Sequence, residues 1–78
     1  SINDAIFIPI ECVLAGTDSI QYVVRKNKTK QVVVLGDENE KNVIVRQGLE
    51  EGTPIYIVPP DDFNKFRMVG QNLLANNQ

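Results

Sequence analysis

Alternating apolar and polar residues predict β structure over the first three quarters of the chain. The sequence holds 18 Val and Ile residues against 8 Leu and Ala, and 16 of the 18 lie between positions 5 and 58. Branching at Cβ suits these side chains to a pleated sheet and makes them mediocre helix formers. A period of two predicts five strands, over residues 5–14, 20–26, 29–35, 42–47 and 54–58.

The five predicted strands differ in how clearly they define an inward face. In the first strand, the alternate positions that share a face are Ile6, Ile8, Ile10, Cys12 and Leu14. Pro9 has no N–H to donate to a ladder, so we expect this strand at a sheet edge or interrupted by a bulge. The apolar run 32–35 could bury either face. In the last two strands, the predicted inward residues are Val43, Val45, Ile55 and Ile57.

Glycine and asparagine mark the expected turns. Asn27 and Lys28 predict a tight hairpin between the second and third strands, because Asn tolerates a positive φ. Residues 36–41 predict a solvated loop, and residues 48–52 a turn bracketed by two glycines with an apolar plug beneath it. The residues assigned to turns are Gly36, Gly48, Leu49 and Gly52.

Pro59 and Pro60 end the predicted β body. Beyond them, Asp61 or Asp62 is suited to cap a short helix. The apolar residues that recur there at helical spacing are Phe63, Phe66, Val69, Leu73 and Leu74. Gly70 weakens such a helix, so two short turns or a loose arm are alternatives.

We expect one β domain over residues 1–60 and a C-terminal tail over residues 61–78. The predicted fold class is mainly β, a small antiparallel β-barrel or sandwich of five to six strands. The tail is expected to be a short helix or an irregular arm.

Composition argues against most catalytic and metal chemistry. The sequence has no His and one Cys, and its five glycines form no phosphate-binding motif. We therefore expect no enzymatic activity, no cofactor and no metal site. Cys12 alternates with isoleucines and is predicted to be a small buried hydrophobe. The net charge of −2 gives no general attraction to nucleic acid or to an anionic membrane.

Four segments carry a resemblance to a known family. Residues 8–13 read I-P-I-E-C-V, residues 21–24 read Q-Y-V-V, and residues 32–36 read V-V-V-L-G. Residues 43–55 read V-I-V-R-Q-G-L-E-E-G-T-P-I. In order and spacing they resemble the membrane-proximal domain of periplasmic adaptor subunits, or membrane fusion proteins, of resistance-nodulation-division efflux pumps. Cys12 and Thr53 depart from the family pattern, in which Ala and Asp are usual at those places.

The resemblance implies a non-catalytic function in assembly. Such a domain rests on the periplasmic face of an inner-membrane efflux transporter and helps to assemble a tripartite complex with an outer-membrane channel. The expected partners are the transporter and other adaptor protomers. The expected location is periplasmic, with membrane association only through the full-length protein. In whole adaptors, strands from the N-terminal part complete this domain, so open sheet edges would allow a homo-oligomer.

Two groups of residues are candidates for partner contact. The first is the basic hairpin tip, which offers a contact to an acidic partner or to lipid headgroups, or protects the hairpin against aggregation. The second consists of residues pointing away from the inward positions, which cover either a second small core or an interface. Together the predicted interface residues are Arg25, Lys26, Lys28, Lys30, Ile44 and Tyr56.

A second hypothesis belongs to a different functional class. The basic hairpin, with Tyr22 as a platform on which a base could stack, suits a small nucleic-acid-binding β-barrel. The net charge and the low aromatic content (6%) count against it, so no nucleic-acid partner is expected.

Overall fold

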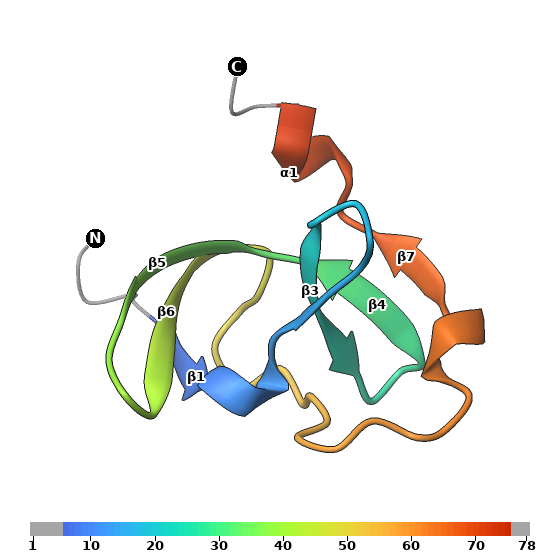
Figure 1. The fold of residues 1–78 in the computed structure, drawn as a ribbon, viewed down its shortest axis with the longest axis horizontal. Coiled ribbons are helices and arrows are strands. Elements are labelled where there is room, and N and C mark those ends of the chain that lie inside the picture. The colour runs from blue at the N-terminus through green and yellow to red at the C-terminus, as the bar shows by residue number, and fades with distance from the viewer. Residues whose placement is uncertain (1–5, 76–78) are drawn as a thin grey trace.

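The computed structural model describes residues 6–75, which form two open β-sheets packed against each other (Figure 1). The first sheet is antiparallel and has the order β1-β6-β5. Its strands are β1 (Ile6–Pro9), β5 (Val34–Glu38) and β6 (Asn42–Gln47).

The second sheet has four strands in the order β2-β3-β4-β7. They are β2 (Leu14–Ala15), β3 (Gln21–Arg25), β4 (Thr29–Val32) and β7 (Arg67–Val69). Strands β2, β3 and β4 pair antiparallel, whereas β7 runs parallel to β4. Short helical turns complete the chain: η2 (Ile10–Cys12), η3 (Phe63–Lys65) and α1 (Asn72–Ala75).

The core lies between the two sheets. Its buried members come from β1, η2, β3, β6 and the link between β4 and β5; they are Ile8, Cys12, Val23, Val33, Val43 and Val45. Half-buried side chains surround them, namely Ile6, Ile10, Val13, Leu35, Leu49 and Ile55. The inward positions predicted for Val43, Val45 and Cys12 are confirmed.

The opposite face of the second sheet is also buried. Tyr22 and Val24 alternate with the core residue Val23 along β3, so they point to the other side of the sheet. Tyr22 is 6% exposed, and its cross-strand neighbour Val32 is fully buried. This sheet is therefore covered on both faces.

The first predicted strand is wrong as a continuous element. β1 ends at Pro9, the 3-10 helix η2 follows, and the chain then enters β2 in the other sheet. Pro9 cannot donate to a ladder, which favours the break at this point. The expected edge position is confirmed, since β1 is the edge strand of its sheet.

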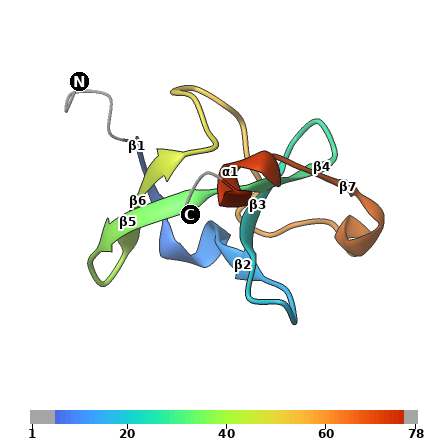
Figure 2. The ribbon, with the colours of Figure 1, turned by 90° about the horizontal axis from the view of Figure 1, so that it is seen from above.

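The third predicted strand is divided at Val33. β4 belongs to the four-stranded sheet and β5 to the three-stranded sheet, and Figure 2 shows the chain passing from one into the other across the molecule. β5 continues through Gly36 to Glu38, so the expected solvated loop shrinks to residues 39–41. The switch between sheets explains why the whole run 32–35 is apolar: Val33 enters the core between the sheets, and Val32 the opposite face.

The fifth predicted strand is reduced to a single bridge between Arg25 and Ile55. Ile55 packs against the core, as predicted, but Ile57 is 52% exposed and does not point inward. Beyond this bridge, the segment makes one further backbone hydrogen bond to β3, in which the Tyr56 N–H donates to the Val24 carbonyl at 2.8 Å. Residues 57 and 58 belong to no strand.

The described part of the tail, residues 61–75, contains the expected short helix but is neither helical throughout nor an irregular arm. It makes the turn η3, then the strand β7 beside β4, and then the single helical turn α1 (Figure 1). Gly70, at φ +87°, separates β7 from α1.

The fold class mainly β is confirmed, with a short C-terminal helix. The described residues form seven strands in two open sheets and no closed barrel. None of the helices within residues 6–75 has the length and apolar character needed to cross a membrane.

Candidate interface residues

The basic hairpin predicted at Asn27 and Lys28 joins β3 to β4. Lys28 has φ +67°, and its N–H donates to the Arg25 carbonyl at 3.0 Å, which closes the turn. The Thr29 hydroxyl donates to Asn27 Oδ1 at 2.6 Å and fixes the Asn side chain. The hairpin is therefore a defined turn that presents Lys26 and Lys28 to solvent.

Tyr56 lies against this hairpin. The Lys26 N–H donates to the Pro54 carbonyl at 3.1 Å, beside the bond from Tyr56 N to Val24. Lys26 Nζ then sits 4.8 Å from the centre of the Tyr56 ring, a cation–π geometry. Two predicted interface residues, 30 positions apart, are thus brought together by the fold.

Lys30 takes part in internal contacts. Its Nζ donates to the Asn64 carbonyl in η3 at 3.2 Å and lies 5.7 Å from the centre of the Tyr22 ring. These contacts hold the tail against the outward face of β3 and β4. Because Tyr22 is buried, it cannot offer a ring face to a nucleic-acid base. The nucleic-acid hypothesis therefore loses the stacking residue on which it depended.

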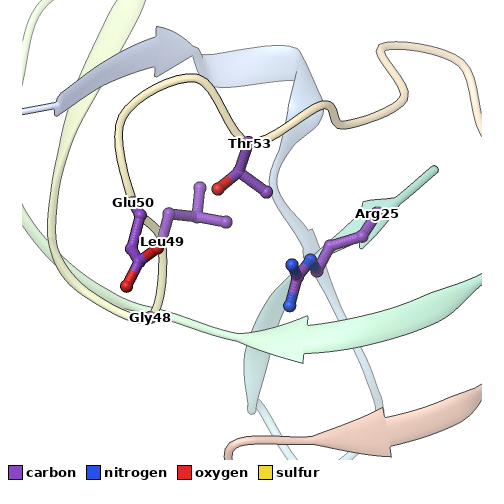
Figure 3. Close-up of a pocket in the computed structure, with 5 residues that line it drawn as sticks. All are labelled: Arg25, Gly48, Leu49, Glu50 and Thr53. Carbon is purple, nitrogen blue, oxygen red and sulfur yellow. The ribbon is translucent and has the colours of Figure 1, made fainter. Parts of the chain in front are cut away.

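Arg25 lines a shallow recess between the hairpin and the turn that follows β6 (Figure 3). The recess has a volume of about 380 Å³ and is lined by Arg25, Gly48, Leu49, Glu50 and Thr53. Arg25 Nη1 donates to the amide oxygen of buried Gln31 at 3.3 Å, which orients the guanidinium.

Ile44 lies apart from the other predicted interface residues, in the three-stranded sheet. It pairs across the strands with Phe7 of β1, so both side chains point to the face opposite the core. Ile44 is half-buried, whereas Phe7 is 61% exposed. The six predicted interface residues therefore do not form one site.

Three exposed residues near these groups are not among the predicted interface residues. Phe7 lies in the first predicted strand and is the exposed aromatic neighbour of Ile44. Lys65 and Arg67 join the basic hairpin because β7 lies parallel to β4, with Arg67 opposite Thr29. No local sequence signal predicts a parallel pairing between segments so far apart.

The residues assigned to turns differ in their backbone. Gly48 (φ +113°) and Gly52 (φ +87°) have left-handed conformations that favour glycine. A Cβ on Gly48 would lie 2.5 Å from the Val32 carbonyl oxygen, so this turn packs directly on the link between the sheets. Leu49 is half-buried against the core. Gly36 lies within β5 instead of a turn and has no positive φ.

Cys12 is the one thiol of the chain, and it is 2% exposed. Burial raises the pKa of the Cys12 thiol, and the neighbouring Glu11 carboxylate raises it further. A thiol held in its protonated form is a poor nucleophile. Within residues 6–75, no three His, Cys, Asp or Glu side chains come together in a way that could hold a metal ion.

A scan of protein-family models and searches of curated proteins and of solved structures each found no match for this chain. The resemblance to efflux adaptors is thus carried by the four motif segments alone. These segments form β1 with η2, the start of β3, the link from β4 to β5, and β6 with its following turn.

Proposed function

We propose that this chain is a non-catalytic adaptor domain. It docks on the periplasmic face of an inner-membrane efflux transporter and helps to assemble a tripartite efflux complex. The proposal rests on the resemblance and on one structural feature, an aromatic residue exposed on the face of the three-stranded sheet that points away from the core.

Residues of the motif segments lie in the core between the two sheets. Val43 and Val45 of the longest motif are core residues, and the Gly48 that follows them touches the link between the sheets. Ile8 of the first motif and Val33 of the third are buried in the same core. The residues that resemble the family are thus those that determine how the two sheets pack.

The observation that carries the docking proposal is the pair Phe7 and Ile44. Phe7 exposes 61% of its surface beside a half-buried Ile44, on the sheet face opposite the core. Exposed aromatic residues next to aliphatic neighbours are typical anchors of protein interfaces. This face is the proposed contact with the transporter.

The strand edges offer a second kind of contact. Among the described residues, β1 and β5 each pair on one side only. An unpaired edge is a template for a strand from another chain. Other adaptor protomers, or further strands of a longer adaptor chain, are the proposed partners at these edges.

Site-specific photo-crosslinking tests the docking proposal. Phe7 is replaced by the photoreactive analogue benzoylphenylalanine in the native gene, and crosslinked proteins are identified in the membrane fraction. The analogue keeps an aromatic ring at this position, so folding should be preserved. We expect a crosslink to a transporter with a large periplasmic portion.

Thr17 serves as the control position, because it is exposed in the turn between β2 and β3 of the other sheet. The analogue at Thr17 should give no such crosslink. A crosslink from Phe7 to a cytoplasmic or nucleic-acid-associated protein would contradict the proposal. So would equal crosslinking from both positions.

A further inference from the structure

Among residues 6–75, two of the three large, strongly exposed apolar residues lie in the segment that crosses β3 at Arg25. Ile57 is 52% and Val58 81% exposed, and both follow Tyr56 directly. Tyr56 is bound to β3 through its backbone and to Lys26 through its ring. In Figure 1 the hairpin and this segment both reach the lower edge of the molecule. We name the surface formed by Lys26, Lys28, Tyr56, Ile57 and Val58 the hairpin end.

Charge is unevenly distributed over the fold. Six of the eight cationic residues lie on β3, the hairpin, β4 or the adjacent η3 and β7: Arg25, Lys26, Lys28, Lys30, Lys65 and Arg67. The end of β5 carries Asp37 and Glu38 instead, and the turn that follows carries Glu40. Although the net charge is −2, the cationic residues are concentrated at the end of the fold that carries the hairpin.

We propose that the hairpin end binds the surface of an anionic lipid bilayer. Lysines attract anionic headgroups, while exposed aliphatic side chains enter the boundary between headgroups and acyl chains. Tyrosine suits this boundary because its ring is apolar and its hydroxyl is polar. An acidic protein surface would match the lysines but would leave Ile57 and Val58 without an apolar environment.

This inference goes beyond the proposed function, because it concerns direct contact with lipid and requires no transporter. It also differs from the sequence-based expectation that the membrane is reached only through the full-length protein. Asp61 and Asp62 are exposed just past the apolar pair and repel the same headgroups. Their removal should therefore strengthen the binding.

Co-sedimentation with lipid vesicles tests the inference on the 78-residue chain. We expect the chain to bind vesicles of phosphatidylglycerol and phosphatidylcholine, and not vesicles of phosphatidylcholine alone. Binding should weaken with salt, because it depends on charge. Polyglutamate, a soluble polyanion without an apolar phase, should bind far more weakly than the anionic vesicles.

Two pairs of variants separate charge from insertion. Lys26→Gln with Lys28→Gln should lower vesicle binding by roughly fivefold per lysine. Ile57→Ser with Val58→Ser should lower it by about tenfold, because the inserted apolar area is lost. Asp61→Asn with Asp62→Asn should raise it.

The matched controls lie in the other sheet. Phe7→Ser removes an equally exposed apolar residue, and Lys41→Gln removes a cation near the acidic turn; neither should change vesicle binding. A circular dichroism spectrum of each variant verifies folding. No binding to anionic vesicles would overturn the inference. Unchanged binding of the Ile57 and Val58 variant, or equally tight binding to polyglutamate, would also overturn it, in favour of an acidic protein partner.

Discussion

The two sheets use their outer faces in opposite ways. In the three-stranded sheet, Val43 and Val45 face the core, while Phe7 and Ile44 point to the opposite face, on which Phe7 is exposed. In the four-stranded sheet, Val23 faces the core, and Tyr22 and Val24 on the other side are buried as well. The described residues of the first sheet bury one face, whereas those of the second sheet bury both faces.

The difference shows which residues stabilise the fold and which are left for partners. The tail from η3 to α1 supplies the extra strand β7 and the contact from Lys30 to Asn64 in the four-stranded sheet. Within residues 6–75, the tail adds no strand to the three-stranded sheet. The proposed protein contact is on this sheet.

Deleting the tail tests this comparison most severely. A chain ending at Pro60 loses β7 and exposes the face that holds Tyr22 and Val24. A domain of this size has a stability of only about 4–12 kcal/mol. We expect the shortened chain to lose cooperative urea unfolding, measured by circular dichroism. A sharp transition with an unchanged midpoint would show that the tail contributes nothing to the sheet.

Substitution of Gly48 tests the junction between the sheets. Gly48→Ala places a Cβ 2.5 Å from the Val32 carbonyl at a positive φ, and we expect a loss of about 3 kcal/mol or more in urea unfolding. Gly52→Ala is the matched control. Gly52 also has a positive φ, but its Cβ would have nothing within 4 Å, so about 1 kcal/mol is expected. Equal losses would contradict the close packing at Gly48.

Val24 and Ile44 compare the two outer faces directly. Val24→Ala removes atoms from a site that is 1% exposed and should cost about 2 kcal/mol. Ile44→Ala removes more atoms, but from a half-buried site, and should cost about 1 kcal/mol in the isolated chain. Both values come from urea unfolding. A larger loss for Ile44 would mean that the outer face of the three-stranded sheet is covered.

Cys12 gives the smallest expected effect. Since burial raises the pKa of its thiol, the folded state keeps the proton more tightly than the unfolded state. The stabilisation that comes from this tighter proton binding is fully present at pH values below the ordinary Cys pKa. It is lost as the pH rises through the raised pKa of the folded state. We expect the stability of the wild type to fall slightly in this range relative to Cys12→Ala.

The thiol chemistry provides an independent measurement. Iodoacetamide should modify Cys12 in the folded chain at least about tenfold more slowly than in urea. Equal rates in both conditions would contradict the buried position.

The strands that could be predicted are those with local partners. β6 has the expected bounds, Asn42–Gln47, and β3 and β4 lie within their expected segments on either side of the hairpin. Alternation and turn residues determine these elements, because each has at least one partner strand close along the chain. Tyr22, Val23 and Val24 form a continuous apolar run, which is the sequence signal of a strand buried on both faces.

The candidate interfaces were less predictable. The lysines of the hairpin were identified from the sequence, but their contact with Tyr56 requires the segment 54–56 to cross β3. Phe7 was missed as an interface residue because a strand with isoleucines on alternate positions does not show whether its other face is covered. Burial of the second face depends on segments distant in sequence.

The amino-acid sequence by itself determined the β class, the hairpin, β6 and the buried character of Cys12, because each depends on residue type and short-range periodicity. Only the tertiary structure decided where strands change sheets, at Pro9 and Val33, and that the tail adds β7 in parallel. These features depend on competition between distant segments for the same hydrogen-bonding edges and the same apolar surface. A local pattern does not contain the outcome of that competition.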